Sequence, residues 1–395
     1  MTRLRVGANL LWLVPGVVGG SEEYTVRVLE SLARLAPDRV AVTLFVNRAL
    51  VAAHPDLVAA FPSVVAPLTS MPHVAGLSKG LRVATEATWL ARQARAEHLD
   101  LLHHMGGTMP VLRGTPGLVT IHDLQPFAFP DHFSVVKRAY LQATVPTSVR
   151  RAVAVVVLTE WTKADVVERI GIDPDRVLLV PPGIDPLMPV DPEVALEARY
   201  RYGIADAPFF LYPAISYAHK NHLSLVRAFA RVTASDDQAK LVLTGGPADA
   251  EQALQSEIWR LGLTDRVVRT GRIPRRDLDA LFSEALALTF PSHYEGFGIP
   301  TLEAMSRGVP VLASTAGALP EVVGDAGVLL DPDDTEAWGD AMLQVLHHDD
   351  FRRALVARGA ARAARFTWTA SAEALVQAYD TAVARLDDTP SEALT

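Results

Sequence analysis

The feature that most constrains the fold of this chain is a regular alternation of short apolar runs, rich in β-branched residues, with segments of helical periodicity. The alternation occurs twice, once in each half of the chain. It predicts parallel sheets whose two faces are covered by helices. The expected strands are Leu4–Leu10, Val40–Val46, Leu101–His104, Leu118–His122, Val153–Leu158 and Val177–Val180 in the first half, and Phe209–Pro213, Lys240–Thr244, Arg266–Thr270, Ala287–Phe290, Val309–Ala313 and Val328–Leu330 in the second.

A break in this pattern separates the two halves. It lies at Pro181-Pro182-Gly183-Ile184-Asp185, where proline and glycine interrupt the alternation. A chain of 395 residues also exceeds what one hydrophobic core usually holds. We therefore predict an α/β protein with two Rossmann-like lobes, residues 1–185 and residues 186–369, whose parallel sheets face each other across a cleft.

The composition excludes several classes of protein. The chain has no cysteine, which removes disulfides, thiolate metal sites and cysteine nucleophiles and fits a reducing compartment. No apolar run approaches the roughly 20 residues that cross a bilayer, and the N-terminus lacks the features of a secretory signal peptide. We expect a cytoplasmic protein that does not span a membrane.

Charge is divided unequally between the halves. Residues 1–185 hold 18 Lys+Arg against 16 Asp+Glu, whereas residues 186–395 hold 19 against 29. The acidic second half argues against a nucleic-acid partner. The basic residues of the first half could meet an anionic acceptor or the inner face of the membrane, or could be solvated, so peripheral association stays open. These residues are Arg82, Arg92, Arg95, Lys137, Arg138, Arg150 and Arg151.

In open parallel sheets a ligand lies beyond the carboxyl ends of the strands, so the residues directly after each expected strand are candidates for a site. These positions carry glycines, hydroxyl groups and histidines in both halves and a lysine in the second, which suit a ligand that bears phosphate. They are Gly19, Gly20, His104, Gly106, Gly107, His122, Asp123, Thr159, Glu160, residues 216–220, Gly245, Gly246, Gly271 and residues 292–298.

The densest candidate segment spans residues 291–308. Pro300 suits the first turn of a helix, and Gly298 lets backbone N–H groups approach an anion at the helix start. Glu295 in the preceding loop and Glu303, expected on the first helical turn, can accept hydrogen bonds from sugar or ribose hydroxyls. The alternative interpretation is that the two glutamates form a capping pair at the helix start.

The spacing of Glu295 and Glu303 resembles the E-x7-E element of the family-four retaining glycosyltransferases. The resemblance covers essentially the full chain. It implies a GT-B fold, retention of anomeric configuration, no required metal, and a last helix, Ala370–Leu386, that crosses back to the first lobe. The other segments that carry it are Gly19-Gly20-Ser21-Glu22, Ile121-His122-Asp123-Leu124, Pro181–Asp185, Gly271 with Pro274 and Asp277-Leu278, Phe290–Pro332 and Phe366-Thr367-Trp368.

The resemblance also implies roles for single residues. Glu303 is expected to bind the ribose, Glu295 to contact the transferred sugar, and Lys220 to neutralise the donor diphosphate, whose charge grows as it leaves. His122 resembles the histidine near the transferred sugar and the acceptor hydroxyl, so His122, Lys220 and Glu295 form the expected catalytic group. The expected donor-binding residues are Gly19, Gly20, Lys220, Asn221, Gly245, Glu295, Gly296, Phe297, Gly298, Ile299 and Glu303.

One position departs from the family pattern. Many relatives have an arginine six residues before the lysine, where this chain has Ala214. The sequence around it is more similar to a branch of bacterial polysaccharide mannosyltransferases. The second phosphate contact is therefore left open, with Arg272 and His219 as candidates. On the acceptor side, His103 and His104 with Gly106 and Gly107 either line the site or form a capped turn, and the loop Leu68–Gly80 is expected to carry specificity.

Other site patterns are disfavoured. Asp331-Pro332-Asp333 and Asp173-Pro174-Asp175 have the D-x-D spacing of metal-dependent transferases but are expected to be turns. Neither a dinucleotide fingerprint after the first strand nor a P-loop is present. We expect no metal site and no cofactor.

These observations predict a retaining glycosyltransferase that moves a hexose from a nucleotide diphosphate sugar to a glycan, lipid-linked or small-molecule acceptor. GDP-mannose is favoured as donor, and a UDP-sugar is the alternative. Two other functions stay open. One is another GT-B chemistry, such as a sugar-nucleotide epimerase or a phosphorylase. The other is a sugar-nucleotide-binding protein without catalysis, which Ala214 in place of arginine keeps open.

Overall fold

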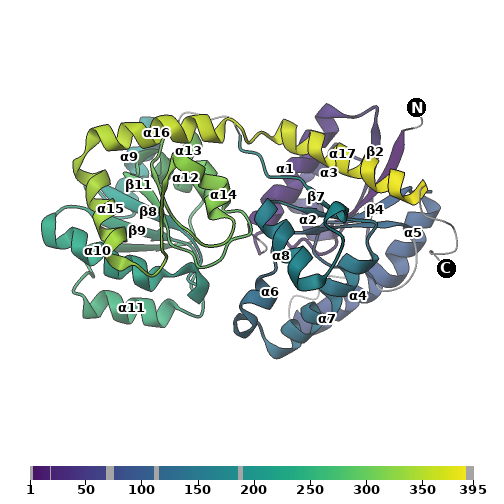
Figure 1. Ribbon diagram of the computed structural model, residues 1–395, viewed down its shortest axis with the longest axis horizontal. Helices are drawn as coiled ribbons and strands as arrows, with labels where there is room; N and C mark the ends of the chain where they lie inside the picture. Colours follow the sequence, from purple (N-terminus) through teal and green to yellow (C-terminus); the bar gives the residue numbers. More distant parts are fainter. Residues whose placement is uncertain (1–2, 18, 68–74, 111–114, 186–189, 388–395) are drawn as a thin grey trace. The chain divides into compact units, whose positions relative to one another are not determined.

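The computed structural model describes residues 3–17, 19–67, 75–110, 115–185 and 190–387. The chain divides into two compact units, each described below by itself (Figure 1). The first unit is Met1–Gly183 with Thr367–Thr395, and the second unit is Ile184–Phe366. Most of the loop that was expected to carry specificity, residues 68–74, lies outside the described residues.

The described part of the first unit contains a seven-stranded parallel sheet with the order β3-β2-β1-β4-β5-β6-β7. The chain moves outward from β1 to β2 and β3 and then returns to the other side of β1 with β4, so the direction of strand addition reverses between β1 and β4. Ligands of open α/β sheets bind at such a reversal. The strands are β1 (Leu4–Asn9), β2 (Val40–Val46), β3 (Ser63–Val65), β4 (Leu101–His104), β5 (Gly117–Ile121), β6 (Ala154–Val157) and β7 (Val177–Leu179).

Helices cover both faces of this sheet. The long helix α1 does so through an apolar stripe, in which Val28 and Leu32 follow Tyr24 at four-residue spacing and all three are buried. The chain's last helix, α17 (Trp368–Asp387), packs alongside α1 (Figure 1). The helices are α1 (Gly20–Leu35), α2 (Arg48–Ala53), α3 (Pro55–Ala59), α4 (Ala75–Thr85), a π-helical turn η1 (Glu86–Leu90), α5 (Ala91–Ala96), α6 (Gln125–Ala128), η2 (Pro130–His132), α7 (Val135–Arg151), α8 (Glu160–Ile170) and η3 (Pro174–Arg176).

The second unit is built on the same plan. Its described residues contain a six-stranded parallel sheet with the order β10-β9-β8-β11-β12-β13, and the direction of strand addition reverses between β8 and β11. The strands are β8 (Phe209–Pro213), β9 (Lys240–Thr244), β10 (Val267–Gly271), β11 (Ala287–Phe290), β12 (Val311–Ser314) and β13 (Val328–Leu330). The helices are α9 (Pro192–Arg201), η4 (Ala218–Lys220), α10 (His222–Ser235), α11 (Glu251–Arg260), α12 (Arg275–Glu284), α13 (Ile299–Ser306), α14 (Leu319–Val323), η5 (Gly324–Ala326), α15 (Thr335–His347) and α16 (Asp349–Ala363).

The predicted α/β architecture with parallel sheets is confirmed, and each expected strand is present within a few residues of its predicted bounds. The edge strand β3 was missed, because three residues are too few to show an alternation. Within the described residues, no helix is long and apolar enough to cross a membrane.

Candidate functional site

At the carboxyl edge of the second unit's sheet, the backbone of Lys220 is fixed from two sides. Tyr212, near the end of β8, donates its hydroxyl to the Lys220 carbonyl (2.7 Å) and also lies 3.1 Å from Ser292 Oγ. Asn221 adopts a left-handed conformation (φ 56°) between η4 and α10, and its Nδ2 donates to the Pro332 carbonyl (2.7 Å). The amide of Asn221, expected to bind the donor, thus has a structural partner that holds the turn in place.

The Lys220 ammonium lies against Glu295. Its Nζ is 2.6 Å from Glu295 Oε1, and the two side chains are 20% and 13% exposed. Lys220 is therefore not a solvated surface lysine. The pair joins the turn after β8 to the loop after β11, which are the two strands at the reversal point of the sheet.

Glu295 is held by its backbone. Its carbonyl accepts from the Ala318 N–H (2.9 Å), and a Cβ atom on Gly317 would lie 2.6 Å from the Glu295 carbonyl oxygen. Gly317 also has a positive φ of 63°, so any side chain there is disfavoured twice. The carboxylate is consequently presented from a rigid loop.

The loop leads into α13, which begins at Ile299 with Pro300 in its first turn. Gly298 precedes it with φ 91°, and a Cβ there would lie 2.6 Å from Leu319 Cδ2, so glycine is required. Phe297 is buried and packs edge-on against Phe366, with ring centroids 5.9 Å apart. No side chain caps this helix start, so the capping-pair interpretation of the two glutamates is wrong.

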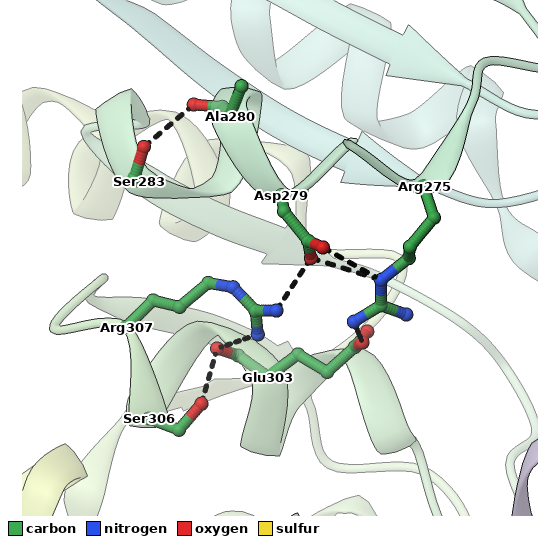
Figure 2. Close-up of polar contacts among 7 residues, drawn as sticks. All are labelled: Arg275, Asp279, Ala280, Ser283, Glu303, Ser306 and Arg307. Atoms are coloured by element: carbon green, nitrogen blue, oxygen red, sulfur yellow. Dashed lines mark hydrogen bonds and ion pairs between the residues drawn. The ribbon is translucent and has the colours of Figure 1, made fainter. Parts of the chain in front are cut away.

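Glu303 lies on the second turn of α13 rather than the first, because the helix begins at Ile299. Its carboxylate is 5% exposed and accepts from Arg275 Nη2 (2.5 Å). Figure 2 shows the Arg275 guanidinium held between Glu303 and Asp279. Arg307 closes the network by donating to Asp279 Oδ1 (2.6 Å) and to the Glu303 carbonyl (3.0 Å). The carboxylate is thus fixed in both position and orientation.

Near Ala214 the structure accounts for one expected glycine, Gly245, by its packing. Gly245 has φ 121°, and a Cβ on it would lie 2.3 Å from the Ala214 carbonyl oxygen, so this expected donor-binding glycine has a packing reason to be glycine. Of the two candidate substitutes for the missing arginine, His219 is buried and stacks on Tyr217, whereas Arg272 extends past Gly246, where a Cβ would lie 3.6 Å from its Nε.

In the first unit, three expected residues lie at the carboxyl edge of the sheet. Gly19 has a positive φ of 62° and precedes α1, which begins at Gly20. His122 follows β5, and its Nε2 lies 2.9 Å from the Met105 carbonyl oxygen. Burial lowers the pKa of His122 to about 4, so the ring is neutral at pH 7. The Tyr24 ring packs edge-on against this imidazole, with centroids 5.5 Å apart.

Two other histidines, expected either to line the site or to form a capped turn, are instead buried residues of β4. His103 is fully buried, with Nδ1 3.0 Å from the Tyr379 hydroxyl and Nε2 2.7 Å from Thr120 Oγ1. His104 is also buried, and its Nδ1 lies 3.1 Å from Asn9 Nδ2. Burial lowers the pKa of both to about 3. They are core histidines that join strands and, through Tyr379, anchor α17.

The two D-x-D segments are turns, as expected. Asp173 accepts from the Asp175 N–H, and Asp331 accepts from the Asp333 N–H, each at 2.9 Å. Asp333 also pairs with His293 (2.9 Å). Among the residues that the structure describes, no group of three or more histidine or carboxylate side chains is arranged to hold a metal ion.

Sequence reasoning missed four residues that shape these two edges. Tyr212 and Gly317 hold the backbones of Lys220 and Glu295, Arg275 pairs with Glu303, and Trp12 lies beside His122 in the first unit. Trp12 and Tyr212 could have been found from the sequence, because they lie at or near the ends of expected strands. Nothing local marks Arg275 or Gly317, because their partners are distant in the sequence.

The fold and the two edges define a class: α/β proteins of two units, each with a parallel sheet whose direction of strand addition reverses once. The sequence comparisons identify the family. Residues 18–186 match the family described as Glycosyltransferase Family 4, and residues 197–362 match Glycosyl transferases group 1. The chain belongs to the family-four glycosyltransferases, and it is a hexosyltransferase with the GT-B fold.

Relatives cover most of the chain. It is 28% identical to O-antigen chain mannosyltransferase B of Escherichia coli over 292 residues, which are 73% of this chain and 77% of the relative. It is 31% identical to the D-inositol 3-phosphate glycosyltransferase of Salinispora tropica over 405 residues, which are 93% and 82% of the two chains.

Solved structures share the fold. Sucrose-phosphate synthase from Thermosynechococcus elongatus has a TM-score of 0.75 at 20% identity, with 96% of this chain and 98% of that chain covered. Anabaena HepE, solved with UDP-glucose, has a TM-score of 0.73 at 20% identity, covering 98% and 100%.

Proposed function

We propose that this enzyme is a retaining glycosyltransferase that transfers a hexose from a nucleoside diphosphate sugar to an acceptor hydroxyl. The observation that carries the proposal is the contact between Lys220 Nζ and Glu295 Oε1 (2.6 Å) at the reversal point of the second sheet. An ammonium and a carboxylate there match the two parts of such a donor. The diphosphate needs a cation, and the sugar hydroxyls need an acceptor of hydrogen bonds.

Donor binding exchanges partners within this pair. A phosphate oxygen replaces the Glu295 carboxylate on Lys220, and Glu295 then accepts hydrogen bonds from the hydroxyls of the transferred sugar. Glu303, oriented by Arg275, accepts from the ribose hydroxyls. The N–H groups at the start of α13 add positive potential near the phosphates.

In the transfer step, the bond from the anomeric carbon to the phosphate oxygen breaks and a bond to the acceptor oxygen forms on the same face of the sugar. The acceptor proton passes to the leaving phosphate, so no additional base is required. Negative charge builds on the diphosphate as it departs, and the ammonium of Lys220 stabilises that charge in a partly buried position.

The names of the relatives guide the choice of substrates. One relative is an O-antigen chain mannosyltransferase, which supports GDP-mannose as donor and a glycan or lipid-linked acceptor. Another is a D-inositol 3-phosphate glycosyltransferase, and HepE was solved with UDP-glucose, so a UDP-sugar and a small polyol acceptor are the second choice. We place the reaction in the cytoplasm and propose that it needs no metal.

The test is thermal stabilisation by GDP, UDP, GDP-mannose and UDP-glucose in the presence of EDTA. A ligand that binds only the folded protein raises the midpoint, so the panel identifies the base without knowledge of the acceptor. Glu303→Ala should lose the shift. Glu336→Ala, an exposed carboxylate on α15, is the matched control and should keep it.

A midpoint shift by one nucleotide that disappears in Glu303→Ala supports the donor site. A shift that requires added Mg²⁺ or Mn²⁺, or that survives in Glu303→Ala, contradicts the proposed role of this edge. Product analysis with the stabilising donor then fixes the anomeric configuration, and an inverted product would refute retention.

A further inference from the structure

The first turn of α12 carries charges that its own helix does not favour. The helix begins at Arg275, followed by Arg276, and no side chain caps it. Cations at a helix N-terminus oppose the helix dipole. A residue that conflicts with its local structure in this way usually has a reason in its tertiary contacts. Arg276 is exposed, whereas the guanidinium of Arg275 contacts two carboxylates.

These two carboxylates hold the Arg275 guanidinium from both sides. Its Nε donates to Asp279 Oδ1 (3.0 Å) and Oδ2 (3.2 Å), and its Nη2 donates to Glu303 Oε1 (2.5 Å) (Figure 2). Asp279 lies one turn further along α12, whereas Glu303 lies on α13. Because Asp279 fixes the guanidinium from its own helix, Arg275 reaches Glu303 from a defined direction.

A second arginine stabilises this arrangement from the side of α13. Arg307 donates to Asp279 Oδ1 (2.6 Å) and to the Glu303 carbonyl (3.0 Å), and its guanidinium packs over the ring of Phe282, 5.4 Å from the centroid. Its side chain is only 14% exposed. The charges of Arg307, Asp279, Arg275 and Glu303 alternate in sign, so each ion has an opposite charge beside it.

The network leaves one oxygen of Glu303 for a ligand. The carboxylate is 5% exposed, and Arg275 contacts its Oε1. Oε2 makes no hydrogen bond within the described part of the chain, and it is not one of the polar atoms there that are shielded from solvent. A glutamate side chain has several rotatable bonds, the last of them with broad torsional freedom, and a ligand that binds a mobile carboxylate must restrict them. Arg275 restricts them before the ligand arrives.

We propose that Arg275, held by Asp279 and Arg307, is a positioning residue that makes the enzyme select ribose over deoxyribose in its nucleotide. The inference rests on the proposed function, in which Glu303 accepts hydrogen bonds from the ribose hydroxyls. A carboxylate that is already oriented binds these hydroxyls without the loss of its own freedom. Removal of Arg275 therefore weakens the contribution of the hydroxyls and leaves the contacts of the base and the diphosphate in place.

The test compares two affinities by isothermal titration calorimetry. The ligands are GDP or UDP, whichever stabilises the wild-type protein, and its 2′,3′-dideoxy analogue. Wild type should prefer the ribose form by about tenfold or more, the effect of a hydrogen bond to a charged group. Arg275→Met keeps the length of the side chain but removes its charge. It should reduce the preference to about threefold or less and bind the dideoxy analogue as wild type does.

A second variant retains both Arg275 and Glu303. Asp279→Asn weakens the contact that holds the guanidinium and should lower the preference for ribose by less than Arg275→Met does. Arg276→Met removes an exposed cation from the same helical turn and is the matched control, which should keep the wild-type preference.

Equal affinity of the wild-type protein for the two nucleotides overturns the proposal, as does a preference for ribose that survives in Arg275→Met. An equal loss of affinity for both nucleotides in Arg275→Met also overturns it, because that result means that the arginine only joins α12 to α13. An unchanged preference in Asp279→Asn overturns the part assigned to Asp279. Failure of the proposed function looks different, because then neither GDP nor UDP would bind the wild-type protein.

Discussion

The carboxyl edges of the two units carry different side chains on the same architecture. In the second unit, the residues at the strand-order reversal are charged and paired: Lys220 with Glu295, and Arg275 with Glu303. In the first unit, the corresponding edge carries a neutral histidine, an indole and glycines, and an ion pair, Arg82 with Glu86, contacts Asn9 at the end of β1. Both edges lie where direction of strand addition changes, so the fold supplies the location and the side chains supply the chemistry.

The difference indicates what each edge can recognise. Charged pairs suit a ligand that brings its own charge, because a phosphate can take the place of a carboxylate on an ammonium while sugar hydroxyls donate hydrogen bonds to the displaced carboxylate. Neutral donors and acceptors suit hydroxyl groups, whose binding needs no counter-ion. Under the proposed function, the second unit thus handles the nucleotide diphosphate, and the first unit handles sugar hydroxyls.

Substitution of Lys220 is the most direct test of the difference between the two edges. If the charged edge stabilises the leaving diphosphate, Lys220→Ala should lower kcat/KM for transfer by about 10²–10³, the usual effect of removing one group that stabilises transition-state charge. Arg276→Ala removes an exposed cation from the same unit and should have little effect. Steady-state rates of the two variants decide this, and equal losses would mean that general charge rather than this pair matters.

Glu295→Gln also tests the difference between the two edges, because it should raise the affinity for the diphosphate and lower the rate of transfer. The neutral amide no longer competes for Lys220 or repels phosphate, so the nucleoside diphosphate should bind a few-fold more tightly. Transfer should fall roughly tenfold or more, since the sugar loses its charged acceptor. Calorimetry with the diphosphate and initial rates with the sugar donor separate the two. A parallel loss of both would show that the pair does not exchange partners.

The two units should also respond differently to pH. Burial lowers the pKa of His103 and His104 to about 3 and of His122 to about 4. Below the ordinary histidine pKa of about 6.5, the unfolded chain takes up protons that these folded residues do not. The first unit should therefore lose stability as pH falls from about 6.5 towards 4, by up to about 1.4 kcal/mol per pH unit for each histidine. The raised pKa of buried Glu86 acts in the opposite direction and offsets part of this loss.

The second unit should lose stability mainly at a lower pH than the first unit. Its carboxyl groups with a lowered pKa include Glu251, with Ser216 and Arg269 as partners, and Glu257, whose pKa is lowered to about 2 by Arg260 and Arg227. Burial lowers the pKa of His222 to about 4, but this single histidine should cost the second unit less stability than the three buried histidines cost the first unit. Urea unfolding at pH 7.0 and 5.5, read by pulsed hydrogen exchange and mass spectrometry, resolves the two units. Equal pH sensitivity of both would contradict the assignment.

The smallest expected effect is that of Tyr212→Phe. The variant keeps the ring but loses the hydroxyl that holds the Lys220 carbonyl and contacts Ser292 Oγ. We expect a loss of about 1 kcal/mol of stability and a few-fold weaker donor binding. Tyr200→Phe, at an exposed tyrosine of α9, is the control. Wild-type donor affinity in Tyr212→Phe would show that the Lys220 turn holds its geometry without this bond.

Single residues show where sequence reasoning succeeds and where it stops. The strands were predictable because buried parallel strands are continuous apolar runs, and α13 was predictable from Pro300 and the glycines around it. The sequence placed His103 and His104 at the correct edge of the sheet but did not show that both side chains are buried in the core. Alternation along a four-residue buried strand does not tell which side chain faces the core. Their partners, Tyr379 and Asn9, come from elements far along the chain.

By itself, the sequence determined the two α/β units, the glycines of the loops and the glutamate pair that marks the family, because these depend on local periodicity and local backbone conformation. Only the tertiary structure decided that Lys220 meets Glu295, 75 residues away, and that Glu303 is oriented by Arg275, 28 residues before it. It also decided that Trp12 and His122 share an edge. Such pairings depend on the order of strands in a sheet, and that order is set by the packing of all the strands and helices together rather than by any one segment.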